Sequence, residues 1–167
     1  MRRVRFPPHT ERMQKLVAAR SGWAALLVVL VLAPVVVWAQ SLQPLTIVTA
    51  SGGRHAFQVE FASNDAERAQ GLMYRRSLAP DRGMLFDFGR VEPVAMWMQN
   101  TYVSLDMLFI RPDGTIARIA ENTEPLSTRT ISSGEPVLGV LEIVAGSAKR
   151  LGIGPGDRVQ HPMFKSR

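Results

Sequence analysis

Two acidic residues lie inside otherwise apolar stretches of this 167-residue sequence. Asp106 lies in the run LDMLFI at 105–110, and Glu142 lies in VLGVLEIV at 137–144. Burial of a carboxylate is costly unless the group is paired or hydrogen-bonded, so each of the two needs a partner. Three polar residues elsewhere in the chain are candidates for that role, namely Arg75, Asn100 and Thr101.

These residue types allow three interpretations. A buried ion pair, or a carboxylate that caps backbone groups, would be purely structural. The same groups would form the floor of a ligand pocket if Trp97 supplied an apolar wall. A general base would instead need one carboxylate that solvent can reach and that has a raised pKa. The candidate ligand-binding residues are Arg75, Trp97, Asn100, Thr101, Asp106 and Glu142, and no residue is assigned a catalytic role.

A metal site has weaker support. Five methionines fall between residues 73 and 107, and Met thioethers suit Cu(I) while Trp can lie over a cation. Methionines that fill gaps in a core are far more common, however. His55 and His161 each lack a second ligand at metal-binding spacing, and we expect them at the surface. The sequence therefore predicts neither a metal nor a cofactor.

Composition excludes several other classes. The chain has no cysteine, which rules out a disulfide scaffold, a cysteine zinc site and a thiol nucleophile. The sequence also lacks GxSxG, HExxH, P-loop and Rossmann motifs. The formal net charge is +6, but residues 1–39 hold almost all of the excess. Because the remaining chain is close to neutral, we expect no nucleic-acid partner.

Residues 1–39 have the composition of an export signal. A basic stretch, in which Met13 is an alternative start, precedes the uncharged run WAALLVVLVLAPVVVWA at 23–39. Val37 and Ala39 suit a cleavage site before Gln40, but residues 23–39 are also just long enough to stay as an inner-membrane anchor. Either outcome predicts a periplasmic or secreted domain.

The rest of the chain predicts a single domain at 45–163, preceded by a linker at 40–44. Asn64 and Glu67 resemble a capping box that begins a short helix ending at Gly71, and 146–151 predicts one further helical turn. Residues 112–114 (PDG) predict a hairpin, whereas 123–135 resembles a loop. Strands are predicted at 45–48, 56–61, 84–88, 94–98, 105–110, 115–119, 137–144 and near 158–159. The expected fold is mainly β, a compact antiparallel sheet folded into a barrel or sandwich with two short helices.

Five sequence blocks in this order resemble a bacterial and archaeal family known as domain of unknown function 192. The blocks are GLMYR at 71–75, GMLF at 83–86, WMQNT at 97–101, LDMLFI at 105–110 and VLE at 140–142. The resemblance implies a small, often exported, β-rich domain without an established activity. It also implies that the signature positions are Arg75, Trp97, Asn100, Thr101, Asp106 and Glu142, which the residue types had already selected.

The sequence thus predicts an exported, monomeric domain without catalytic activity that binds a small ligand or acts as an accessory protein. One alternative is an envelope hydrolase that uses Asp106 or Glu142 as general base. Another is a structural partner of an envelope protein complex, which would show an exposed apolar patch.

Overall fold

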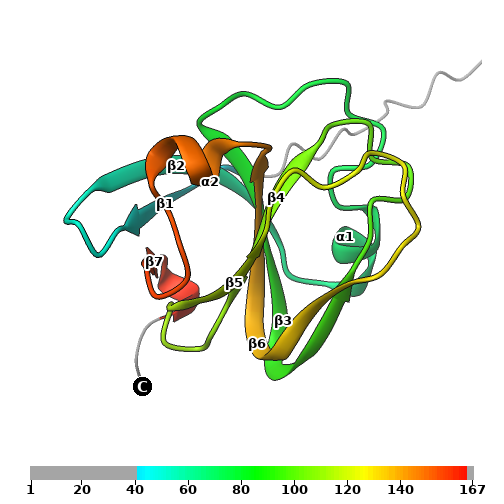
Figure 1. Ribbon diagram of the computed structural model, residues 1–167. Coiled ribbons are helices and arrows are strands. Elements are labelled where there is room, and N and C mark those ends of the chain that lie inside the picture. Colours follow the sequence, from blue (N-terminus) through cyan, green and yellow to red (C-terminus); the bar gives the residue numbers. More distant parts are fainter. Residues whose placement is uncertain (1–40, 165–167) are drawn as a thin grey trace, which may run out of the picture. The chain divides into compact units, whose positions relative to one another are not determined.

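The computed structural model describes residues 41–164, which fold around one seven-stranded sheet of order β5-β4-β6-β3-β2-β1-β7 (Figure 1). All neighbouring strands are antiparallel except β2 and β3, which are parallel. The predicted β-rich class is therefore confirmed. The elements are β1 (Gln43–Val48), β2 (Arg54–Ala62), α1 (Asp65–Gln70), β3 (Arg82–Met96), β4 (Leu105–Ile110), β5 (Ile116–Ala120), β6 (Ile131–Val144), α2 (Ser147–Leu151), β7 (Arg158–Gln160) and the 3-10 helix η1 (Pro162–Phe164).

The sheet curls into a half-barrel, which brings its edge strands β5 and β7 close to each other. Thr115, just before β5, forms an antiparallel bridge with Arg158 of β7. The β4–β5 hairpin predicted from residues 112–114 contributes to this contact between the two edges. Its Gly114 has φ +87°, and the Gly114 carbonyl accepts a hydrogen bond of 2.8 Å from the Val159 N–H. A Cβ atom at Gly114 would lie only 2.5 Å from the Val159 oxygen, so the position requires glycine.

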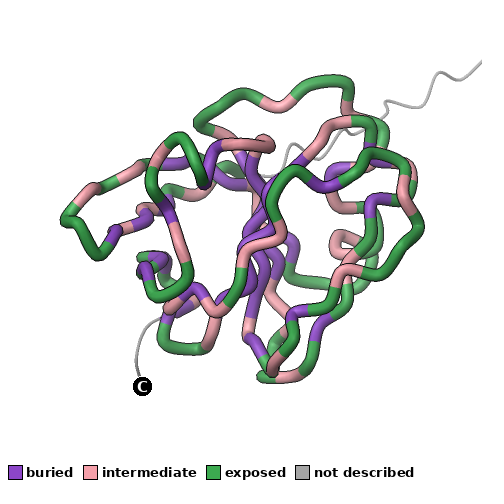
Figure 2. The backbone as a smooth tube through the Cα atoms, viewed as in Figure 1, coloured by how far each residue is buried: buried purple, intermediate pink, exposed green. Residues whose placement is uncertain are grey.

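Both faces of the central strands are buried, as the purple segments in Figure 2 show. Alternate side chains of a strand point to opposite faces, so β4 and β6 contribute to two separate apolar clusters. One cluster includes Leu108 and Leu141 and packs against α2; the other includes Phe109 and Val140 and extends to Leu72, just after α1. Figure 1 shows the two helices on opposite sides of the central strands. Two adjacent residues of one strand can therefore belong to different sites.

The first helix forms where its capping signals predict. The Asn64 side chain accepts a hydrogen bond of 3.0 Å from the Glu67 N–H, and the Glu67 carboxylate accepts one of 2.8 Å from the Ser63 N–H. Gly71 ends the helix, as predicted, with φ +48° and ψ −135°, a positive φ outside the left-handed helical region that C-terminal glycines usually adopt. A Cβ atom there would lie 3.2 Å from the Phe86 ring, so α1 ends close against the sheet.

Three predicted boundaries were wrong. Residues 84–88 and 94–96 belong to one long strand, β3, which stays paired with β6 across register shifts between Asp87 and Glu92 and between Pro93 and Ala95, while residues 97–98 lie beyond its end. That pairing also makes the end of the predicted loop at 123–135 part of β6, which begins at Ile131. The linker is shorter than predicted because Gln43 already pairs with Val59.

Residues 1–40 lie outside the described residues, so the export signal stays a prediction. Within 41–164, every helix is too short or too polar to cross a lipid bilayer.

Candidate ligand-binding site

The two candidate carboxylates lie on opposite faces of the sheet. In the register of β4 and β6, Asp106 is opposite Ile143 and Met107 is opposite Glu142. Residues paired across strands share a face and successive residues alternate, so Asp106 and Glu142 point in opposite directions. Asp106 faces the α2 side and Glu142 faces the α1 side, which excludes a single site built from both.

Asp106 is a structural carboxylate that is fully buried and fully hydrogen-bonded. Its oxygens accept hydrogen bonds from the backbone N–H groups of Asn122 (2.9 Å), Gly146 (3.1 Å) and Ala148 (2.9 Å). The cap residue of α2, Gly146, has no side chain to satisfy the first N–H groups of that helix, so Asp106 satisfies them from the neighbouring strand. Of the roles considered for Asp106, the structure therefore supports the structural one, in which the carboxylate caps backbone N–H groups.

Glu142 has no such partners. Its residue is 4% exposed, and among the described residues no hydrogen-bond donor or cation is paired with its carboxyl group. Its cross-strand neighbours are Met84 and Met107, whose thioethers cannot donate a hydrogen bond. Removal from water raises the pKa of Glu142 to about 8, which leaves it mostly protonated at neutral pH.

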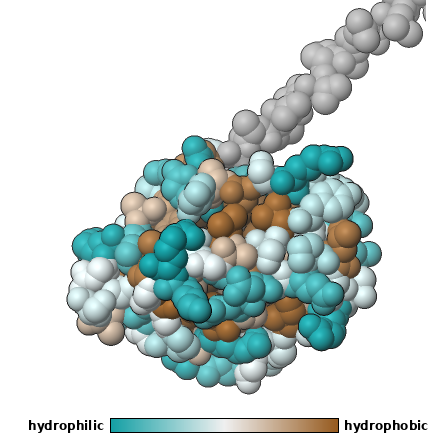
Figure 3. All heavy atoms as spheres, turned by 45° about the horizontal axis from the view of Figure 1, so that its top comes forward, coloured by the Kyte–Doolittle hydropathy of each residue, from teal (hydrophilic) through white to brown (hydrophobic). Residues whose placement is uncertain are grey.

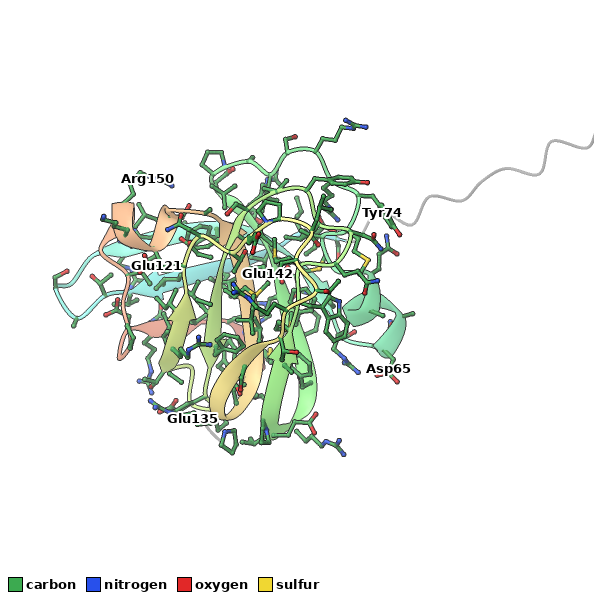
Figure 4. The ribbon with its side chains drawn as sticks, turned by 45° about the vertical axis from the view of Figure 1, so that its right-hand side comes forward. Asp65, Tyr74, Glu121, Glu135, Glu142 and Arg150 are labelled. Carbon is green, nitrogen blue, oxygen red and sulfur yellow. The ribbon has the colours of Figure 1, made fainter. Side chains whose placement is uncertain are left out.

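The Glu142 side chain lines a cavity of about 240 Å³ between α1 and the sheet. Figure 4 shows Glu142 in the interior of the domain, with Asp65 of α1 at the surface. The walls are mainly apolar, and we call this space the Glu142 cavity. It is lined by Asp65, Arg68, Ala69, Gln70, Gly71, Leu72, Met73, Phe86, Phe88, Ala95, Met96, Trp97, Thr101 and Glu142.

Two further predicted residues reach this cavity. Trp97 forms part of its wall while 48% of the residue remains exposed, so the indole lies between the cavity and solvent. Thr101 is buried, and its hydroxyl donates a hydrogen bond of 3.2 Å to the Gln99 carbonyl. The structure thus brings Trp97, Thr101 and Glu142 together.

Arg75 does not pair with either candidate carboxylate, contrary to the sequence-based expectation. Its guanidinium forms a two-pronged ion pair with Glu60, which includes a contact of 2.7 Å from Nη2 to Oε2. This carboxylate raises the pKa of Arg75. The pair lies in a larger, open hollow on the other side of the end of α1, and Gln70 and Gly71 line both spaces.

Asn100 supports the cavity from outside. It adopts φ +57°, and its carbonyl accepts a hydrogen bond of 2.8 Å from the Tyr74 N–H, while its side-chain amide donates one of 3.1 Å to the Tyr74 hydroxyl. These bonds hold the segment that contains Met73, a wall residue of the cavity. Asn100 therefore positions the wall without lining the cavity itself.

Comparison with known proteins places this fold in a family. The family model DUF192, described as "Uncharacterized ACR, COG1430", matches residues 46–161. The chain belongs to the DUF192 family. A search of curated proteins gave no match.

Two solved structures are similar to this DUF192 domain. A Sinorhizobium meliloti 1021 protein described as a "putative transcription regulator" is 55% identical with a TM-score of 0.71, over 72% of this chain and 94% of that one. A protein of unknown function from Novosphingobium aromaticivorans DSM 12444 is 40% identical with a TM-score of 0.69, over 72% of this chain and 85% of that one.

The methionines of this DUF192 domain are divided between the wall of the Glu142 cavity and the core next to it. Met73 and Met96 line the Glu142 cavity, but the Met98 sulfur accepts a hydrogen bond of 3.2 Å from the Thr123 hydroxyl. Met84 and Met107 are buried in the core beside Glu142. Within residues 41–164 there is also no group of three or more His, Cys, Asp and Glu side chains able to hold a metal ion.

His161 is buried, contrary to its predicted surface position. Its Nε2 lies 2.9 Å from the Gln43 side-chain oxygen, and its ring centroid lies 5.5 Å from that of Phe61. The physical reason is β7, which pairs with β1 and brings this end of the chain against the sheet.

Exposed apolar side chains lie on the loops around the cavity. Leu126 and Tyr74 adopt positive φ, and the Leu126 N–H donates a hydrogen bond of 3.0 Å to the Thr101 carbonyl. Figure 3 shows one face of the domain, on which apolar groups reach the surface between hydrophilic ones. The exposed apolar residues on these loops are Tyr74, Trp97, Tyr102 and Leu126.

Sequence reasoning missed most of the cavity wall. The walls contributed by Ala69 and Gln70 come from α1, and those contributed by Phe86 and Phe88 come from β3. Apolar residues on a strand carry no signal that separates a cavity wall from a packed core. Gly71 was the predicted feature nearest to this part of the wall, because it ends α1 beside the Phe86 ring.

Proposed function

We propose that this DUF192 domain is a small-ligand-binding domain and that its binding site is the Glu142 cavity. The observation that carries the proposal is a carboxyl group that is buried and unpartnered among the described residues, and that lines a mainly apolar cavity. Ligand sites are usually concave and apolar, with a few polar groups that orient the ligand. A ligand that pairs with Glu142 would offset the cost of burying that carboxyl.

The size of the cavity limits the ligand. Its volume of about 240 Å³ is below the range of pockets that hold drug-sized molecules, which is roughly 300–1,000 Å³. The ligand is therefore a small metabolite or one end of a longer molecule. Trp97, at the boundary between cavity and solvent, would cover the bound ligand.

We also propose that the domain acts outside the cytoplasm, in the periplasm or as a secreted monomer. The basic and apolar composition of residues 1–39 supports this location. The Sinorhizobium relative is described as a "putative transcription regulator", a role that would imply a nucleic-acid partner for that protein. Residues 41–164 carry nearly equal numbers of basic and acidic side chains, which favours a small molecule as the partner instead.

The test is native mass spectrometry of the full chain purified from its own cells. We expect a bound small molecule, and two alanines of α1 provide matched variants. Ala69 lines the Glu142 cavity and Ala66 lines the neighbouring hollow, so Ala69→Phe should release the molecule and Ala66→Phe should retain it. An unoccupied wild-type protein, or equal retention by both variants, would contradict the proposal.

A second candidate function is that of an envelope hydrolase with Glu142 as general base. The raised pKa of Glu142 favours this role, and Asp106 is unsuited to it because all its hydrogen-bond contacts hold backbone groups. The expected activity against p-nitrophenyl esters would rise with pH up to about 8 and disappear in Glu142→Gln. Equal rates in the wild type and this variant would exclude Glu142 as the base.

A further inference from the structure

We infer that the ligand of the Glu142 cavity is a small organic cation, whose ammonium group lies against the Glu142 carboxylate. This inference rests on the proposed function and specifies the chemical class of the ligand. It follows from the charges that face the cavity, from its shortage of hydrogen-bond donors and from its aromatic walls.

The cavity has one unbalanced charge when Glu142 is ionised. The other charged residues that line it, Asp65 and Arg68, form an ion pair with each other, and Arg68 also donates a hydrogen bond to the Asp87 carbonyl. An anionic ligand would meet an unscreened carboxylate of its own sign. A cation would give Glu142 the counter-charge that the described residues do not provide.

When Glu142 is ionised, the cavity also offers few donors to a ligand that is rich in oxygen. Thr101 uses its hydroxyl hydrogen on the Gln99 carbonyl, and the thioethers of Met73 and Met96 cannot donate. Gln70 and Trp97 are the remaining uncharged side chains in the lining with N–H groups. A phosphate, carboxylate or sugar would therefore leave most of its acceptors unpaired, which a buried site penalises.

The apolar part of the wall suits an alkylated ammonium group. Phe86, Phe88 and Trp97 contribute three aromatic rings to the lining. The Arg68 guanidinium already lies 5.7 Å from the centroid of the Phe88 ring, so Phe86 and Trp97 are the rings left for a ligand, and aromatic faces attract organic cations. The indole of Trp97 is the better of the two ring types for this interaction. A carboxylate beside aromatic and thioether groups thus favours the ammonium group over a strongly hydrated metal cation.

The experiment compares choline with its uncharged isostere 3,3-dimethyl-1-butanol by calorimetry on the full chain at pH 6–9. Neither probe gains or loses a proton between pH 6 and 9, so any pH dependence of binding comes from the protein. We expect choline to bind at least 30-fold more tightly than the isostere at pH 9. Its affinity should rise nearly tenfold per pH unit between pH 6 and 8, where Glu142 must lose its proton, and then level off.

Two glutamine variants make the assignment specific. Glu142→Gln keeps the shape and removes the charge, so choline affinity should fall at least 30-fold and lose its pH dependence. Glu121→Gln makes the same chemical change at an exposed residue that does not line the cavity, and it should bind like the wild type. Figure 4 labels both positions.

Equal binding of choline and the isostere would overturn the inference, and so would unchanged choline binding in Glu142→Gln. Absence of binding by both choline and tetramethylammonium at pH 9 would overturn it as well. In each case a co-purified molecule that Ala69→Phe releases would leave the proposed function standing. Failure of both experiments would overturn the two together.

Discussion

Replacement of Glu142 by glutamine should remove a pH-dependent destabilisation of the folded domain. The folded state holds the Glu142 proton up to about pH 8, whereas the unfolded chain releases it near its ordinary value of 4.5. Between these pH values the folded state binds more protons, so rising pH favours unfolding. The contribution of Glu142 to the free energy of unfolding is greatest below pH 4.5. It falls progressively up to about pH 8 and stays constant above that pH.

The magnitude follows from the size of the pKa difference. Each pH unit in this window corresponds to roughly 1.4 kcal/mol, so the wild type should lose about 3–5 kcal/mol between pH 5 and 8 through Glu142 alone. Glu142→Gln carries no titrating proton at this site. The difference in unfolding free energy between the variant and the wild type should therefore grow in favour of the variant across the same window.

Urea unfolding at pH 5, 6, 7 and 8 measures this difference. The carboxyls of Glu67, Asp113 and Glu135 have lowered pKa values, because hydrogen bonds from Ser63, Thr115 and Arg111 respectively stabilise their charged forms. Their contributions are common to both proteins and cancel in the comparison. Glu121→Gln is the control and should follow the wild type. A difference between Glu142→Gln and the wild type that stays constant across the four pH values would refute the reasoning.

Three further substitutions test the surrounding structure. Asp106→Asn should cost about 2–4 kcal/mol in urea unfolding, because one amide N–H₂ group would face backbone N–H donors; a loss below about 1 kcal/mol would contradict the capping role. Glu60→Gln should cost less than about 1 kcal/mol, since its ion pair with Arg75 is partly exposed, and it should leave choline binding unchanged. Gly114→Ala should lower stability by about 2–3 kcal/mol through its positive φ and its contact with the Val159 oxygen, and unchanged thermal unfolding would contradict this.

Local signals predicted the elements of the fold better than their pairing. Asn64, Glu67 and Gly71 lie within eight residues of one another, and the helix they indicate forms between them. The alternation of apolar residues located most strands in the same way. By contrast, the continuation of β3 past Gly89 depends on its partner β6, whose pairing across the register shift keeps the two halves of β3 in one strand.

The candidate site depended on pairing and was therefore only partly predictable. The sequence selected Asp106 and Glu142 because each interrupts an apolar run, but the β4–β6 register decides which face each one reaches. Arg75 was matched with the wrong carboxylates for the same reason. The parallel pairing of β2 with β3 places Glu60 beside Met84, whose partner on its other side is Glu142. Arg75 forms its ion pair with Glu60 and not with Glu142.

The contrast between the two carboxylates is the strongest argument that Glu142 serves a ligand. Both are buried in the centre of the same sheet, yet Asp106 has three backbone donors and Glu142 has no partner among residues 41–164. A destabilisation of about 3–5 kcal/mol is a large fraction of the 5–15 kcal/mol that typically stabilises a domain. An apolar residue like Leu141 or Ile143 would avoid it, so stability alone does not account for glutamate at 142. A group that binds in the cavity and pairs with the carboxylate accounts both for the residue and for the space beside it.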